Sequence, residues 1–241
     1  MELSPSEYQI EDLRRMSAAK NYFAWQGRLI ERETGKRVLE YGCGTGNITS
    51  LLIGATNPLD VIVSVDPDPA CVAKLVERYP KQANLHVLTG DPRDMHEELK
   101  PWRFDTVVST NVLEHIEDDH AAIATMTHLL EPGGAIVLFV PAFPALYGPT
   151  DRLLAHARRY TRRAIVDLAA KSGLRIRKLH HVNLVGFFGW WMNARVLRLT
   201  EQSPAQIAVF DSLVVPIMSR LEEIVTPPFG QSLFAVLEKP R

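Results

Sequence analysis

The chain has 241 residues, of which 46% are hydrophobic and 23% are charged, the composition of an ordinary globular protein. This length accommodates one large α/β domain or two small ones. The formal net charge is -1 and the pI about 6.7, so neither nucleic acid nor an anionic membrane surface is an expected partner.

The cysteine content and the apolar runs of the sequence indicate in which cellular compartment the protein is expected. Two cysteines, Cys43 and Cys71, are too few for a disulfide framework and have no metal-site spacing, which favours a reducing compartment. The first residues do not combine a basic region with an apolar core, so no signal peptide is predicted. The longest uncharged apolar run, "HVNLVGFFGWWMNA", is too short to span a bilayer. We therefore expect a cytoplasmic protein without an integral membrane segment.

Apolar, β-branched runs alternate with amphipathic stretches in the first part of the chain. The expected strands are "RVLEYG", "DVIVSVD", "LHVLTGD", "FDTVVSTNV" and "AIVLFVPA", and the expected helices are "NITSLLIGA", "PACVAKLVERY" and "DDHAAIATMTHLL". Near-continuous apolar strands separated by helices predict a parallel sheet covered on both faces, and hence a doubly wound α/β fold.

Segments with other patterns flank this core. Residues 1–36 are expected to form one or two lid helices, in which Tyr22 either closes over a ligand or packs in the core. The later part predicts a helix, "RRAIVDLAAKSG", and two strands, "LRIRKLHHV" and "GQSLFAVLEKP", that pair as a hairpin-like edge. We therefore divide the chain into lid helices (1–36), a core (37–183 and 229–241) and a helical acceptor-binding insertion (184–228).

Three glycines, Gly42, Gly44 and Gly46, occupy alternate positions at the end of the first strand. Ligands of open parallel sheets bind at this edge, although a turn with nothing bound is the alternative. The dinucleotide pattern G-x-G-x-x-G fails, because its third glycine would fall on Asn47 or Thr49. A phosphate-binding loop fails as well, since no Gly-Lys-Ser/Thr follows.

With Glu40 before these glycines, "VLEYGCGTG" resembles the first motif of the class I S-adenosylmethionine-dependent methyltransferases, and the resemblance extends to "LEPGGAIVLFVPA". It implies a seven-stranded, mostly parallel Rossmann-like sheet with an antiparallel last strand, and S-adenosylmethionine as cofactor. This cofactor carries no phosphate, so the loop needs only a close approach of its backbone to the amino-acid and ribose parts. We expect Glu40 to accept hydrogen bonds from the methionine ammonium.

The ends of neighbouring strands supply the other expected cofactor contacts. Asp66 follows "VIVSV", where its carboxylate can bind both ribose hydroxyls, while Asp68 is expected to cap the next helix. The resemblance places Asp91 at the adenine amino group and indicates that His115 in "TNVLEHIED" is structural rather than catalytic. The full expected set is Glu40, Gly42, Cys43, Gly44, Gly46, Asp66, Pro67, Asp91, Pro92, Asn111, Val112 and Tyr22.

Methyl transfer from a sulfonium is an in-line displacement that requires alignment and the exclusion of water. It needs no metal, and the His and Cys spacings predict none. The sequence "STNV" differs from the Asp/Asn-Pro-Pro-aromatic run of enzymes that methylate amino groups of DNA or of glutamine, and the chain has no Pro-Cys pair of the cytosine-C5 type. We therefore expect a small, partly hydrophobic metabolite as acceptor, with an oxygen nucleophile favoured.

The C-terminal half resembles a subgroup of small bacterial methyltransferases, types 11 and 12, through "VPA", "LYG", "HARRY" and "NLVGFFGWWMN", with Ala155 where glycine is expected. Counting along the sixth strand puts Ile176 and His180 on one face and His181 on the other. His181, and otherwise His180, is the expected base for a hydroxyl acceptor, although an inert histidine fits equally well. The expected acceptor contacts are Tyr147, His156, Arg159, Tyr160, Asn183, Trp190 and Trp191.

Two alternatives remain open at this point. A protein of this fold can use the bound sulfonium as a scaffold for a non-methylating reaction such as cyclisation, or can serve as a cofactor-binding accessory subunit. Release of S-adenosylhomocysteine during turnover would distinguish a methyltransferase from an enzyme that catalyses a non-methylating reaction. The nearly intact motif set argues against an accessory subunit. The sequence specifies neither the acceptor nor the oligomeric state.

Overall fold

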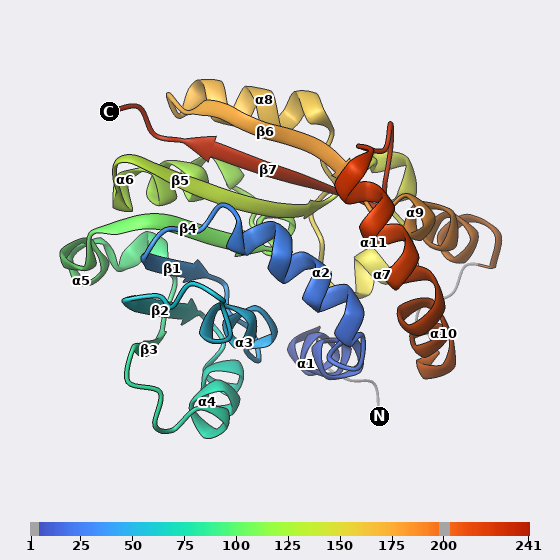
Figure 1. Cartoon of the computed structure of the whole chain (residues 1–241), viewed down its shortest axis with the longest axis horizontal. Coiled ribbons are helices and arrows are strands. Elements are labelled where there is room, and N and C mark those ends of the chain that lie inside the picture. Colours follow the sequence, from blue (N-terminus) through green and yellow to red (C-terminus); the bar gives the residue numbers. More distant parts are fainter. Residues whose placement is uncertain (1–4, 198–202) are drawn as a thin grey trace.

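The computed structural model describes residues 5–197 and 203–241 (Figure 1). Its centre is a seven-stranded sheet in the order β3-β2-β1-β4-β5-β7-β6. Strand β7 runs antiparallel to both of its neighbours, and the other pairs are parallel, which confirms the predicted fold class. The strands are β1 (Arg37–Tyr41), β2 (Val61–Asp66), β3 (Leu85–Thr89), β4 (Phe104–Thr110), β5 (Leu130–Pro141), β6 (Arg175–Val182) and β7 (Ser232–Glu238).

Helices cover both faces of the sheet and gather at one of its ends. Those that follow strands of the core are α3 (Asn47–Ile53), α4 (Pro69–Arg78), α5 (His96–Leu99), α6 (Asp119–Leu129), α7 (Pro149–Leu153) and α8 (Arg162–Lys171). The helices from the two flanking segments are α1 (Pro5–Met16), α2 (Lys20–Glu31), α9 (Leu184–Trp191), α10 (Pro204–Val209) and α11 (Val215–Ile224). Figure 1 shows α1, α9, α10 and α11 together at the end toward which the arrowheads of β1 and β2 point.

Alternation along the strands builds two hydrophobic layers. In β1, Leu39 packs with the cluster beneath α6 and α8, while Val38 packs with the cluster beneath α2 and α3. Ile123 of α6 and Ile30 of α2 are examples of the helical residues that these layers bury. Burial of such a side chain contributes about 1.5–3 kcal/mol, so the two layers hold the strand ends in fixed positions.

The structure of strand β6 contradicts one prediction about which of its residues share a face of the sheet. The pairing of β6 with β7 shifts between Ile176 and Lys178, so that Ile176 lies opposite Leu237 and His181 lies opposite Leu233. Leu237 and Leu233 belong to the same hydrophobic layer, against which Ile176 packs. The bulge therefore places Ile176 on the face of His181, and the prediction that it shares a face with His180 is wrong because simple alternation ignores the extra residue.

The two flanking segments are helical, as predicted, and an unusual cap joins them. No side chain caps α2 at its own N-terminal residue, Ala19. Instead Asp211, 190 positions away from Asn21, accepts hydrogen bonds from the backbone N–H groups of Asn21 (3.1 Å) and Tyr22 (2.8 Å). A carboxylate at a helix N-terminus satisfies free N–H groups and interacts favourably with the helix dipole. The division of the chain into functional units stays a prediction.

The structure also bears on membrane insertion. Among the residues described, no helix combines the length and the apolar character that a bilayer crossing requires.

Replacing Asp211 tests the connection between the flanking segments. Asp211→Ala is expected to lower the free energy of unfolding by about 1.5–3 kcal/mol, because it removes a buried carboxylate and leaves charge-assisted hydrogen bonds unmade at a partly buried helix end. Thermal unfolding followed by circular dichroism measures the change. Asp167→Ala, in an exposed pair with Arg163 at 4.0 Å, is the control and should have little effect. Equal stability of the two variants would contradict this role of Asp211.

Candidate active site

A cavity of about 860 Å³ opens at the carboxyl ends of β1, β2 and β4. The helices α1 and α2, the turn after β3, the turn after β4, residues between 150 and 159, and residues of the segment 184–228 contribute further parts of its wall. This edge is where open α/β sheets bind ligands. The predicted site residues that line it are Tyr22, Gly42, Cys43, Gly44, Asp66, Pro67, Asp91, Pro92, Asn111, Val112, His156, Arg159, Asn183 and Trp190.

The glycine loop needs the backbone freedom that its sequence indicates. Gly42 and Gly44 have φ angles of 83° and 50°, in the left-handed region that favours glycine. A Cβ atom on Gly42 would lie 2.4 Å from a methyl carbon of Val112, so the two segments approach as closely as glycine permits. The loop thus presents its backbone, rather than side chains, to the cavity.

Asp66 fixes this loop. Its Oδ2 accepts a hydrogen bond from the N–H of Gly44 (2.7 Å), and its Oδ1 accepts one from the N–H of Asp68 (2.9 Å). Burial raises the pKa of Asp66, and these two hydrogen bonds act in the opposite direction. Asp68 itself accepts from the N–H of Ala70 at the start of α4, which confirms the predicted cap.

Asp91 occupies the cavity wall after β3 but is already partnered. It caps the short turn Pro92–Asp94 by accepting from the backbone N–H of Arg93 (2.9 Å), and it also pairs with the Arg93 guanidinium. The guanidinium lowers the pKa of Asp91, which therefore stays ionised. Its contact with the adenine amino group stays a prediction.

Glu40 lies beneath the loop rather than in the cavity wall. Its side chain is 1% exposed, and Oε2 accepts hydrogen bonds from the hydroxyls of Thr49 and Ser64, both at 2.6 Å. Burial raises the pKa of Glu40 to about 7. These contacts tie α3 to β1 and β2. The expected contact with the methionine ammonium stays a prediction, and the placement of Glu40 gives it no support.

The two histidines of β6 are not part of the cavity wall. His181 stacks on Phe143 with ring centroids 4.9 Å apart, and His180 lies against Phe234 at 5.4 Å. Burial lowers the pKa of both histidines, which keeps them neutral. The structure thus separates the expected bases from the site, and their catalytic role stays a prediction without support from geometry.

Other expected residues lie outside the wall as well. The Tyr147 hydroxyl donates to the carbonyl of His156 (2.7 Å), and the buried Tyr160 hydroxyl donates to the carbonyl of Leu113 (3.1 Å). Gly46 is the N-cap residue that precedes α3, and Trp191 is 44% exposed on α9. We assign Tyr147 and Tyr160 to the support of neighbouring loops, and their direct contact with an acceptor stays a prediction.

The wall opposite the glycine loop carries a buried polar group. Arg159 donates from Nε to Oδ1 of Asp151 (2.8 Å), and its guanidinium lies 4.6 Å from the ring centroid of Trp190. The Nδ1 atom of His156 is 3.0 Å from the same oxygen of Asp151. Asp151 therefore orients both Arg159 and His156, two of the predicted acceptor contacts.

Gln26 and Glu114 line the cavity and were not predicted. Both are buried, and the polar side-chain atoms of both have no hydrogen-bond partner among the residues described. Gln26 is buried on α2 together with Trp25 and Ile30. A polar residue among the apolar residues of this helix was therefore the one sign in the sequence that could have indicated Gln26 as a site residue. Burial raises the pKa of Glu114 to about 7 and lowers that of His115 to about 4.

Comparison with known proteins identifies the family. Residues 8–179 match the family model described as "Methyltransferase domain". The chain belongs to this family and is a class I S-adenosylmethionine-dependent methyltransferase. S-adenosylmethionine is its cofactor.

Two curated relatives show how far the similarity extends. A trans-aconitate 2-methyltransferase from Mycobacterium tuberculosis is 27% identical over 211 residues, covering 85% of this chain and 77% of the relative. An uncharacterised 37.1 kDa protein in transposon TN4556 of Streptomyces fradiae is 25% identical over 175 residues, covering 73% of this chain. The matched region spans only 50% of that protein.

Solved structures confirm the fold. A chain from the Haloferax volcanii complex with the Trm112 methyltransferase activator superposes with a TM-score of 0.67 at 17% identity, covering 98% of both chains. The N-methyltransferase NodS from Bradyrhizobium japonicum, in complex with S-adenosyl-L-homocysteine, gives a TM-score of 0.56 at 16% identity. That match covers 96% of this chain and 88% of NodS.

Variants of the loop and its anchor test the cofactor site. Asp66→Ala is expected to weaken S-adenosylhomocysteine binding by roughly ten- to a hundredfold, because charge-assisted hydrogen bonds are worth about 1.5–3 kcal/mol. Gly44→Val is expected to weaken binding too, because a side chain is strained at the φ of 50° and its Cβ would lie 3.0 Å from a methyl carbon of Leu13 in the cavity wall. Calorimetry measures the affinity, and the exposed Asp60→Ala is the control. Normal binding by Asp66→Ala would rule out its predicted role.

Glu40 makes stability depend on pH. Because its pKa is about 7 in the folded chain and 4.5 as an ordinary glutamate, its contribution to stability is fully present below pH 4.5 and is lost as pH rises through 7. The loss is about 3 kcal/mol. Unfolding by urea at pH 5 and pH 8 should show a smaller fall for Glu40→Gln than for the native chain, and an equal fall would contradict the assignment. A tenfold loss of S-adenosylhomocysteine affinity in this variant would instead support the ammonium contact.

Proposed function

We propose that this methyltransferase acts on a small, partly hydrophobic metabolite and that the accepting atom is an oxygen. The observation that carries the proposal is the mixed character of the cavity wall facing the glycine loop. Apolar side chains from the flanking segments, among them Leu13, Phe23 and Phe210, contribute to the same wall as Gln26 and Arg159. Small-molecule sites combine such apolar walls with a few placed polar groups.

The size and charge of the site support a small acceptor. The cavity, about 860 Å³, also has to accommodate the cofactor, so the space left for the acceptor is limited. The net charge of -1 gives the chain no overall electrostatic attraction to a nucleic acid. The Mycobacterium relative is named for a small acceptor, trans-aconitate, which agrees with this substrate class.

Different residues of the cavity are proposed to bind the cofactor, to exclude water and to position the reacting groups of an in-line transfer. The glycine loop and Asp66 are proposed to hold the amino-acid and ribose parts of the cofactor, while α1 and α2 exclude water. Burial raises the pKa of Tyr22 to about 12, and its hydroxyl is hydrogen-bonded with Ser232 and Asn183, so Tyr22 remains protonated. It therefore positions groups rather than removing a proton.

The proposed location is the cytoplasm. Cys43 and Cys71 are both free and buried, which is compatible with a reducing compartment. Burial also raises the pKa of both thiols, so neither is an activated nucleophile.

Ligand binding and turnover test the proposal together. Calorimetry should detect binding of S-adenosylmethionine and S-adenosylhomocysteine and none of NAD, because the glycine spacing does not form a dinucleotide loop. A panel of hydroxylated and carboxylated small molecules, matched by amines of similar shape, is then assayed for release of S-adenosylhomocysteine. Turnover with the oxygen acceptors is the expected result. Turnover confined to the amines would contradict the oxygen preference, and tight NAD binding alone would contradict the cofactor site.

A further inference from the structure

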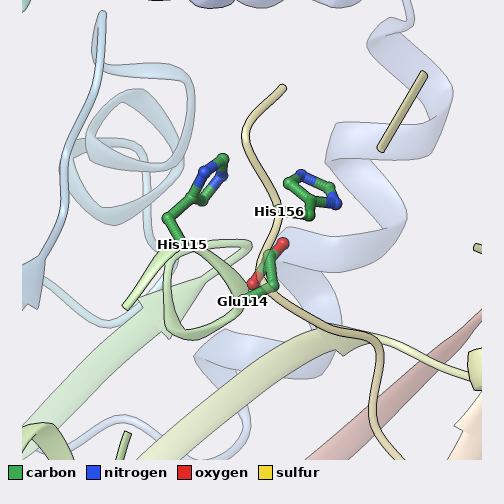
Figure 2. A group of neighbouring side chains, drawn as sticks. All are labelled: Glu114, His115 and His156. Atoms are coloured by element: carbon green, nitrogen blue, oxygen red, sulfur yellow. The ribbon is translucent and has the colours of Figure 1, made fainter. Parts of the chain in front are cut away.

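Three side chains that the cofactor does not account for converge in the wall of the cavity. Glu114, His115 and His156 each place one potential ligand atom within 4.8 Å of the others. Figure 2 shows the two imidazole rings next to each other, with the Glu114 carboxylate below them, and the ring centroids are 4.6 Å apart. Glu114 and His115 belong to the 3₁₀ turn Leu113–His115 after β4, and His156 follows α7. The N–H of Ala157 donates to the carbonyl of Glu114 (2.7 Å), which joins the two segments.

The Glu114 carboxylate is buried and has no hydrogen-bond partner among the described residues. It is 1% exposed, and the lack of a partner within the described part of the chain holds for both of its oxygens. The nearby Arg159 donates a hydrogen bond to Asp151 at 2.8 Å rather than to Glu114, so Asp151 offsets part of the positive charge near Glu114. A buried carboxylate without a partner is costly, and a bound cation would remove that cost.

Both histidines are oriented in the manner of metal ligands. His156 has Nδ1 3.0 Å from the carboxylate of Asp151, and His115 is hydrogen-bonded to the backbone of Leu154. When one ring nitrogen donates to a carboxylate or a carbonyl, the other carries a lone pair, and metal-binding histidines are commonly held in this way. The cluster therefore presents lone pairs from two histidines and one carboxylate.

We propose that Glu114, His115 and His156 form a binding site for a divalent transition-metal ion such as Zn²⁺, Mn²⁺ or Co²⁺. Two histidines and one carboxylate suit these ions and leave coordination positions open. Bonds of about 2.0–2.2 Å require the side chains to close inward around the ion. The open positions face the cavity, because all three residues line it.

A metal ion at this site would have a defined role in the proposed reaction, namely to bind the accepting oxygen. If the acceptor is an oxygen nucleophile, as the proposed function holds, a metal ion at this position would bind that oxygen and favour its deprotonated form. This role rests on the proposed function, whereas the binding of the ion does not. This site cannot be predicted from short ligand motifs, because His156 is distant in the chain from the Glu114-His115 pair and the three residues match no such motif.

Titration with Co²⁺ tests the site directly. The protein is freed of metal with a chelator and titrated with CoCl₂, while visible absorption and calorimetry report the binding. One bound Co²⁺ per chain is expected at the cluster. Glu114→Gln, His115→Asn and His156→Asn should each weaken its binding by at least tenfold. S-adenosylhomocysteine affinity, measured in parallel, shows whether each variant retains its fold and its cofactor site.

A second histidine pair supplies the matched control. His96 and His128 lie with ring centroids 5.1 Å apart and are not in the cavity wall, so His128→Asn should leave the Co²⁺ affinity unchanged. Acetohydroxamate, a bidentate oxygen ligand, should alter the Co²⁺ spectrum without removing the ion, because open positions face the cavity.

Three results would overturn the proposal. These are the absence of saturable Co²⁺ binding, affinities that do not change in the three variants, and a spectrum insensitive to acetohydroxamate. Normal Co²⁺ binding together with absent S-adenosylhomocysteine binding would contradict the proposed function instead. The two ideas can therefore fail separately.

Discussion

The hydrogen bonds from the backbone of Gly44 and Asp68 to the carboxylate of Asp66 are the interaction on which the site depends. They connect the loop after β1 to the turn after β2, two neighbouring parallel strands whose carboxyl ends open into the cavity. The left-handed backbone of the loop has a conformational cost, and Asp66 offsets part of it by holding the loop in one conformation. A carboxylate in this position can still accept hydrogen bonds from the ribose hydroxyls.

The rest of the cavity is built from segments that are distant in the chain. Asp211 holds the N-terminal end of α2, and Glu222 accepts hydrogen bonds from the N–H groups of Asn183 (2.8 Å) and Leu184 (2.9 Å) at the start of α9. Residues of α1, α2 and the segment 184–228 thus complete a cavity wall that begins at the strand ends of the sheet. The proposed acceptor surface therefore depends on contacts between the flanking segments, and the proposed cofactor surface depends on the sheet.

Sequence patterns predicted the elements with strong local signals. The apolar strands, the glycine loop and the cap at Asp68 all follow from periodicity or from short spacing rules, and the structure contains each of them. The orientation of β6 was predicted less well, because a bulge between Ile176 and Lys178 changes which residues share a face. Alternation alone contains no information about such an extra residue.

The polar groups of the cavity could be predicted only in part. Arg159 and His156 were expected from the family resemblance, whereas Gln26 and Glu114 become evident only once their burial and missing partners are known. His180 and His181 lie at the end of a strand, where a catalytic base is expected, but their rings pack against Phe234 and Phe143, respectively. Proximity to a strand end thus does not determine whether a side chain enters the cavity.

A crystal structure with bound S-adenosylhomocysteine tests the central claim most directly. The account predicts that the ribose hydroxyls lie within hydrogen-bond distance of the Asp66 carboxylate and that the amino-acid part lies against the backbone of Gly42 and Gly44. The N–H of Gly44 should still donate to Asp66 in that complex. Binding of S-adenosylhomocysteine elsewhere, or an Asp66 side chain turned away from both the ligand and Gly44, would contradict the account.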